Sequence, residues 1–170
     1  MFRKNHSNVY DDAFFAVHFE QSLRSAKVIA PVVHRLFSPR SIVDVGCGLG
    51  AWLQAFSEGG KDQICGIDGA YVNPENLLIP PAKFIAQDLS RSFEIPGRYD
   101  LAISLEAAEH LSGKAGAHLV HTLTKAAPLV MSPRQCLAKA ARTISTNSGA
   151  PTGVHCSLTK DSGCSVRSGH

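Results

Sequence analysis

The most informative segment of this chain is Asp44-Val45-Gly46-Cys47-Gly48-Leu49-Gly50, a glycine loop between two predicted regular segments. The β-branched run at 41–45 is typical of a buried strand, and residues 51–57 place their apolar side chains at helical spacing. Glycines in such a turn let the backbone bend tightly and approach a ligand closely. The first turn of the following helix directs free amide groups to the same place. The sequence therefore predicts a strand, a ligand-binding loop and a helix in succession.

Further strands and helices alternate along the chain. Hydrophobic periodicity predicts helical segments at 11–37 and 107–127, and strands at 63–67, 83–86, 99–105 and 129–131. Pro31 marks a boundary or a kink in the first helical segment. This alternation favours an α/β fold with four or five parallel strands and right-handed crossovers.

Composition and charge exclude several classes of protein. The 170 residues are 44% hydrophobic and 18% charged, with a net charge of +3. This charge is too small to indicate a nucleic-acid or membrane surface, and no stretch approaches the roughly 18 apolar residues of a membrane span. The basic N-terminal residues lack the apolar core of a secretory signal. We therefore expect no nucleic-acid partner and no membrane association, while oligomeric state is left open.

The cysteines indicate a reducing compartment. Their number is odd and no two form a CxxC pair; they are Cys47, Cys65, Cys136, Cys156 and Cys164. This pattern predicts neither a disulfide framework nor a zinc site. We expect a cytoplasmic protein.

An acidic residue closes the second predicted strand. Asp68 lies 18 residues beyond Gly50 in the sequence. A carboxylate at the carboxyl end of that strand can accept hydrogen bonds from both ribose hydroxyls of an adenosine cofactor. The alternative is a tight turn without a ligand and a surface aspartate. Tyr71 and Asn73 follow closely and are candidates for lining the same adenosine pocket.

The spacing of the glycine loop resembles that of one enzyme family. Its G-x-G-x-G pattern follows an acid by two residues and differs from the dinucleotide pattern G-x-G-x-x-G. Residues 43–50 resemble the first motif of class I S-adenosylmethionine-dependent methyltransferases, and the resemblance extends over about 40–131. It implies a Rossmann-like doubly wound parallel sheet of order 3-2-1-4-5. It also implies S-adenosyl-L-methionine as cofactor and methyl transfer to an acceptor, which we expect to be a small molecule.

The resemblance also implies a role for individual residues. Asp44 would face the methionine end of the cofactor, and Asp68 would hold the ribose. Asp88 matches the position near the adenine amino group, and Leu89 would lie against the adenine. The expected cofactor-binding residues are Asp44, Gly46, Cys47, Gly48, Gly50, Asp68, Gly69, Asp88, Leu89 and Glu106.

A second acidic group follows the fourth predicted strand. Residues 104–111 resemble the E-x-x-E-H-L segment of the same family, in which Glu106 lies at the edge of the active site. Glu106, Glu109 and His110 could share one helical face, where a carboxylate raises the basicity of an imidazole. Glu106 and His110 are therefore the candidate catalytic residues, as acceptors of a proton. The alternative is an acid-rich helix N-terminus with a packing histidine. No metal site is expected, because one histidine with two glutamates is a thin ligand set.

The character of the chain changes after Met131. Residues 132–170 are rich in serine and threonine and hold few bulky apolar residues. Too little apolar surface is available there to offset chain entropy, which predicts low order. We divide the chain into an N-terminal helical segment at 1–37, a cofactor-binding domain at 38–131 and a low-order tail at 132–170.

A shifted reading frame explains this change of character. Plausible codons for Pro133 onward, read two nucleotides later, encode A-A-M-P-G-Q-G-G-T-N-H-I-N-E-Q. That string resembles the continuation of a bacterial subgroup of these methyltransferases. We interpret 132–170 as a translation out of frame; the alternative is a divergent natural tail. Two other functions stay open: an inactive remnant that only binds S-adenosylmethionine, and an NAD-dependent oxidoreductase, which the glycine spacing disfavours.

Overall fold

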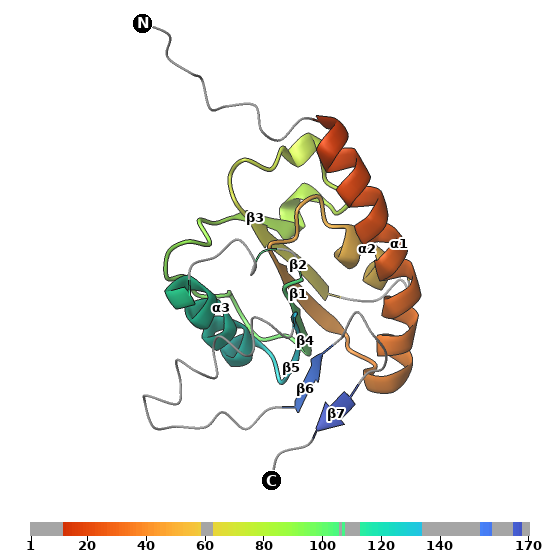
Figure 1. Cartoon of the computed structure of the whole chain (residues 1–170), viewed down its shortest axis with the longest axis vertical. Coiled ribbons are helices and arrows are strands. Elements are labelled where there is room, and N and C mark those ends of the chain that lie inside the picture. Colours follow the sequence, from red (N-terminus) through yellow and green to blue (C-terminus); the bar gives the residue numbers. More distant parts are fainter. Residues whose placement is uncertain are drawn as a thin grey trace, which may run out of the picture.

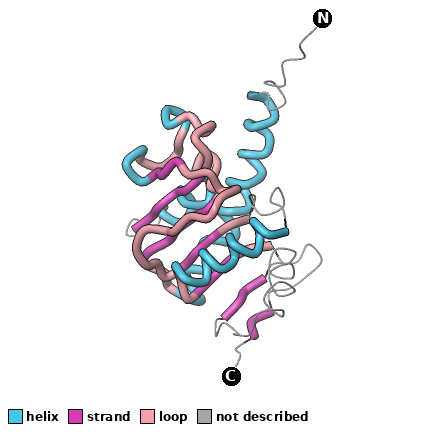
Figure 2. Tube along the Cα trace, turned by 90° about the vertical axis from the view of Figure 1, so that its left-hand side faces the viewer, coloured by secondary structure: helices cyan, strands magenta, loops and turns pink. Residues whose placement is uncertain are grey.

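The chain folds into a sheet with helices on both faces (Figure 1). The computed structural model describes residues 12–58, 63–105, 107, 113–133, 154–157 and 165–167. Helices α1 (Asp12–Phe37) and α2 (Ala51–Ser57) lie on one face of the sheet, and α3 (Gly113–Ala126) lies on the other. Figure 2 shows the same layers from the side, with α3 in front of the strands. The expected α/β architecture is confirmed.

The strands occur in the predicted order. They are β1 (Ser41–Val45), β2 (Gln63–Asp68), β3 (Phe84–Ala86), β4 (Leu101–Ile103), β5 (Leu129–Met131), β6 (Val154–Ser157) and β7 (Ser165–Arg167). Their order across the sheet is β3-β2-β1-β4-β5-β6-β7, and all neighbours pair in parallel except β6 and β7. The expected order 3-2-1-4-5 is therefore confirmed, with two strands added at one edge.

The two added strands lie in the segment for which low order was predicted. β6 pairs with β5 from Leu129↔Val154 to Met131↔Cys156, and β7 returns antiparallel along β6. These two strands are the described part of 134–170, and low order in the rest of the tail remains a prediction. Pairing at a sheet edge uses backbone groups that every residue except proline supplies, so apolar periodicity is a poor guide to such short strands. The other residues of 134–170 lie outside the described part of the chain.

Helix α1 packs on α2 through small side chains. Ala26 and Ala30 are fully buried, which lets the two helices approach closely. The His34 ring lies 5.4 Å from the Phe56 ring, centroid to centroid, and its Nε2 is 3.1 Å from the Phe56 carbonyl oxygen. Pro31 lies inside α1 without ending it, so the long helix is continuous over the residues described.

The core consists of two apolar layers on opposite faces of the sheet. Val43 and Val45 of β1 point into the layer under α3, whereas Ile42 points into the layer under α1 and α2. Burial on both faces explains the continuous β-branched run of this strand, as is usual in parallel sheets. The described residues contain no helix that is both long and apolar enough to cross a membrane. The sheet thus holds the carboxyl ends of β1, β2 and β4 at one edge.

Two short 3₁₀ helices, η1 (Pro74–Asn76) and η2 (Pro81–Lys83), connect β2 to β3. Helix α3 is described over Gly113–Ala126, within the helical segment predicted at 107–127, and residue 107 lies in a bend.

Candidate functional site

The glycine loop turns through backbone conformations that favour glycine. Gly46, Gly48 and Gly50 have φ angles of 78°, 52° and 87°. The Gly46 amide donates a hydrogen bond to the Ile67 carbonyl at 2.7 Å, which ties the loop to the end of β2. Gly50 is the N-cap of α2, so the loop leads directly into the amino end of that helix.

The three glycines differ in the space beside them. A side chain on Gly46 would collide with Ala107, and one on Gly50 would press against Ile79 at 3.1 Å. A side chain on Gly48 would meet no atom of the described residues within 4 Å. Gly46 and Gly50 therefore serve close packing of the protein itself, whereas Gly48 borders open space that a ligand can enter.

Asp68 is buried directly beside this loop. Its side chain belongs to the last residue of β2, and the residue is only 3% exposed. Its Oδ2 accepts a hydrogen bond from the Gly48 amide at 2.7 Å, and its Oδ1 accepts one from the Gly69 amide at 2.7 Å. The Tyr71 hydroxyl also donates to Oδ1. The structure thus joins the two features that the sequence separates by 20 residues, the loop and the acid.

Asp44 occupies the middle of the sheet. It is 2% exposed and lies in register with Gly66 of β2 and Ile103 of β4. Its position near the carboxyl end of β1 places it under the glycine loop. Its expected role at the methionine end of the cofactor remains a prediction.

Cys47 is a buried thiol with little nucleophilic character. Burial raises its pKa strongly, and the negative charges of Asp44 and Asp68 raise it further. A thiol with a raised pKa stays protonated near neutral pH and reacts slowly. Its Sγ packs close to Gly66, and an added side chain at Gly66 would collide with it. The Cys47 side chain thus fills space under the loop, and its expected part in cofactor binding remains a prediction.

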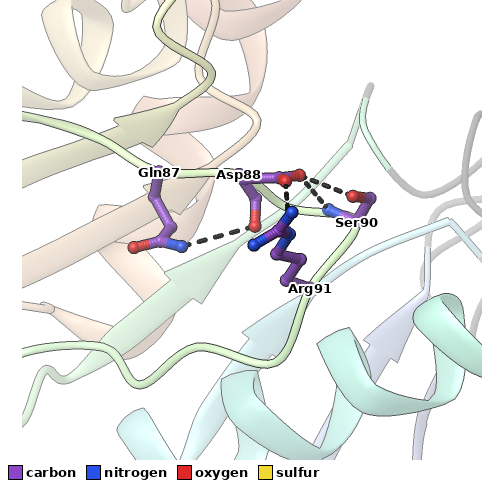
Figure 3. Close-up of polar contacts among 4 residues, drawn as sticks. All are labelled: Gln87, Asp88, Ser90 and Arg91. Atoms are coloured by element: carbon purple, nitrogen blue, oxygen red, sulfur yellow. Dashed lines mark hydrogen bonds and ion pairs between the residues drawn. The ribbon is translucent and has the colours of Figure 1, made fainter.

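Asp88 and Leu89 lie beyond the carboxyl end of β3, which is the strand next to β2. The Asp88 carboxylate turns back onto its own loop (Figure 3): Oδ1 accepts from the Ser90 amide at 3.0 Å and the Ser90 hydroxyl at 2.6 Å, and Oδ2 lies 3.2 Å from Arg91 Nε. These Ser90 hydrogen bonds, with a smaller contribution from Arg91, lower the pKa of Asp88. Leu89 is half-buried against the apolar layer under α3. Recognition of adenine by this pair remains a prediction.

The end of β3 is nevertheless tied to Asp68. The Gln87 amide donates to the Asp68 carbonyl oxygen at 2.7 Å. Asn73, the other candidate lining residue, uses its side chain to cap η1, where Oδ1 accepts from the Glu75 amide at 3.0 Å. Asn73 is exposed, so the structure assigns its side chain to the turn.

The candidate catalytic residues Glu106 and His110, together with Glu109, lie outside the described residues.

The described chain contains a pair of buried serines that the sequence did not indicate as site residues. Ser104 follows β4 and Ser132 follows β5; they are 0% and 2% exposed. Neither hydroxyl has a hydrogen-bond partner among the residues that the structure describes, although buried hydroxyl groups usually have one. Within the described ranges, no cluster of three His, Cys, Asp or Glu residues could hold a metal ion.

The geometry suits an adenosyl ligand. A buried carboxylate lies beside a glycine with open space, at the carboxyl edge of a doubly wound sheet, which is where such sheets place ligands. Carboxylate oxygens and loop amides are the groups that hold ribose hydroxyls and the adjoining polar atoms. The residues present therefore fit S-adenosylmethionine.

Comparisons with known proteins agree with this geometry. The family described as "Methyltransferase domain" matches residues 18–130. The search of curated protein sequences finds no significant match. Among solved structures, the chain is similar to an amino pentose methyltransferase of Micromonospora echinaspora with SAM bound (TM-score 0.56, 18% identity, 89% of this chain and 58% of that one).

Two further structures show the same fold. One is an O-methyltransferase family protein of Burkholderia thailandensis (TM-score 0.56, 13% identity, 88% of this chain and 42% of that one). The other is the plantazolicin methyltransferase BpumL in complex with SAH (TM-score 0.52, 17% identity, 85% and 61%). The chain spans less than two thirds of the length of each of these three structures. The match over 18–130 covers more than half of the sequence, and the chain accordingly belongs to the methyltransferase-domain family.

Proposed function

We propose that this chain binds S-adenosyl-L-methionine and belongs to an enzyme that transfers the methyl group to a small-molecule acceptor. The observation that carries the proposal is the contact between the buried Asp68 carboxylate and the Gly48 amide, beside open space. Support comes from the family match and from similar folds solved with SAM or SAH. The absence of a membrane-spanning helix among the described residues is compatible with the cytoplasmic location that we propose.

Three residues would contact different parts of the bound ligand. Asp68 would hold the ribose, Gly48 would let the ligand approach the main chain, and Asp44 would face the methionine end. Because the loop and the acid are already hydrogen-bonded to each other, much of this arrangement exists before the ligand arrives. Preorganisation of this kind lowers the entropic cost of binding.

The chemistry itself requires mainly alignment. Bound S-adenosylmethionine supplies an electrophilic methyl group on a sulfonium. The protein has to hold an acceptor nucleophile in line with that methyl group and to exclude water. A proton leaves the acceptor as it is methylated, and Glu106 or His110 is the proposed proton acceptor. The buried hydroxyls of Ser104 and Ser132 lie at the ends of the neighbouring strands β4 and β5.

An alternative function is favoured by one observation. Residues 132–170 have a sequence unlike that of an apolar α/β segment, which supports an out-of-frame origin. A chain of that kind would keep the cofactor loop and lose a finished acceptor pocket. Such a remnant would bind S-adenosylmethionine without transferring its methyl group.

Isothermal titration calorimetry with S-adenosylmethionine, S-adenosylhomocysteine and NAD tests the proposal. Binding of the first two but not NAD is expected. Failure of a demonstrably folded sample to bind either adenosyl ligand would reject both the enzyme and the remnant. Radiolabelled methyl transfer to candidate acceptors then separates an active enzyme from a remnant.

A further inference from the structure

The Asp68 carboxylate is unequally occupied by the protein itself. A carboxylate offers about four acceptor positions, two on each oxygen. Oδ1 accepts from the Gly69 amide and from the Tyr71 hydroxyl, whereas Oδ2 accepts only from the Gly48 amide within the described part of the chain. One oxygen is therefore filled, and the other retains one open position.

A ribose that binds a carboxylate through both of its neighbouring hydroxyls needs one acceptor position on each carboxylate oxygen. Oδ2 can receive one hydroxyl at once. Oδ1 can receive the other only if one of its two present donors leaves. The Gly69 amide belongs to the main chain next to Asp68 and cannot withdraw without moving β2. The Tyr71 hydroxyl is at the end of a rotatable side chain.

We propose that the Tyr71 hydroxyl occupies the acceptor position on Asp68 that one ribose hydroxyl takes when the ligand binds. Tyr71 therefore lowers the affinity for adenosyl ligands and reduces what that ribose hydroxyl contributes to the binding free energy. This inference rests on the proposed function, because it assumes that Asp68 holds the ribose.

The surroundings of Tyr71 allow it to leave. Its side chain is 73% exposed, although Asp68 beneath it is 3% exposed. The ring lies directly over Gly69, so that a side chain at Gly69 would collide with it. Rotation of Tyr71 into solvent therefore breaks its hydrogen bond to Asp68 without opening the core, and it uncovers the carboxylate for the ligand.

This arrangement makes a specific prediction for ligands that lack one hydroxyl. A ligand without the hydroxyl that meets Oδ1 has no reason to displace Tyr71. A ligand without the other hydroxyl still has to displace it. Removal of the Tyr71 hydroxyl should therefore raise the affinity for ligands that carry the hydroxyl meeting Oδ1, and should leave unchanged the affinity for the ligand that lacks it.

The test measures dissociation constants for S-adenosylhomocysteine and its 2′-deoxy and 3′-deoxy analogues, with the wild-type chain and Tyr71→Phe. The variant keeps the ring over Gly69 and removes only the hydroxyl. We expect it to bind S-adenosylhomocysteine about 3- to 10-fold more tightly, since the ligand no longer competes with a hydrogen bond of ordinary net strength. We expect the same gain for one deoxy analogue and none for the other.

A second tyrosine provides the matched control. Tyr99 is buried in the apolar layer under α3, where it interacts with Cys65. Tyr99→Phe should leave all three affinities unchanged. A uniform change across the three ligands, or weaker binding of S-adenosylhomocysteine by Tyr71→Phe, would overturn the inference. Absence of binding to every adenosyl ligand, by wild type and variant alike, would instead reject the proposed function and the inference together.

Discussion

Replacement of Asp68 by alanine should affect both folding and ligand binding. The change removes an acceptor that receives hydrogen bonds from the Gly48 amide, the Gly69 amide and the Tyr71 hydroxyl. The exposed tyrosine regains hydrogen bonds with water, and the Gly48 amide borders open space, so neither carries a large penalty. The Gly69 amide is buried and is left without its acceptor, which typically costs about 1–3 kcal/mol.

These contributions add up to a measurable loss of stability. With the partial loss at Gly48, we expect Asp68→Ala to lower the free energy of unfolding by about 2–4 kcal/mol. Loss of the charge-assisted hydrogen bonds to ribose should weaken S-adenosylhomocysteine binding by about 1–3 kcal/mol, or about 5- to 150-fold. Urea unfolding and calorimetry measure the two effects separately, and Asp68→Asn gives a milder variant that keeps the side-chain volume.

Asp100 offers a control with similar local chemistry at the other end of β1. Its Oδ2 accepts from the Arg40 amide at 2.7 Å and the Ser41 amide at 3.1 Å. Asp100→Ala should therefore destabilise the fold while leaving ligand affinity unchanged. If both variants lose stability and both retain wild-type affinity, Asp68 does not hold the ribose and the site assignment is wrong.

Further predictions address the loop, the pH dependence, the thiol and the gene. Gly46→Ala should destabilise the fold by about 1–3 kcal/mol, because φ is 78° and the added methyl group collides with Ala107. Gly116→Ala, at a helical position with free space, should instead stabilise it by about 0.5–1 kcal/mol in urea unfolding. The hydrogen bond from the Arg40 amide makes the largest contribution to lowering the pKa of Asp100, followed by the contacts with Ser41. The ionised Asp100 side chain therefore stabilises the fold fully above the ordinary carboxyl pKa of about 4, and this stabilisation is lost as pH falls through the lowered pKa of the folded state. Asp100→Asn should consequently make the free energy of unfolding depend less on pH on the acid side. Cys47 should react with iodoacetamide at neutral pH only after unfolding, and fast labelling of the folded chain would contradict its raised pKa. Sequencing the coding DNA across Met131 should reveal an open frame for the shifted peptide, and an early stop codon there would end that interpretation.

Several features of the fold could be predicted because their causes are local. The run at 41–45 has β-branched residues buried on both faces, and the loop after it consists of glycines with positive φ. Such turn chemistry is visible within seven residues of sequence. The strands β6 and β7 could not be found in this way, because they are held by edge pairing and carry little apolar periodicity.

The candidate site shows the same division. The residue pattern alone predicted a glycine loop between a buried strand and a helix, and an acid at the end of the next strand. The order 3-2-1-4-5 followed from the family resemblance, and the sheet has that order at its centre. The contact of Asp68 with Gly48, the contact of Tyr71 with the same carboxylate and the return of Asp88 to Ser90 became visible in the three-dimensional structure alone. Periodicity and turn preference act between residues close in the chain, whereas these contacts depend on strand register and on the rotamers that packing permits.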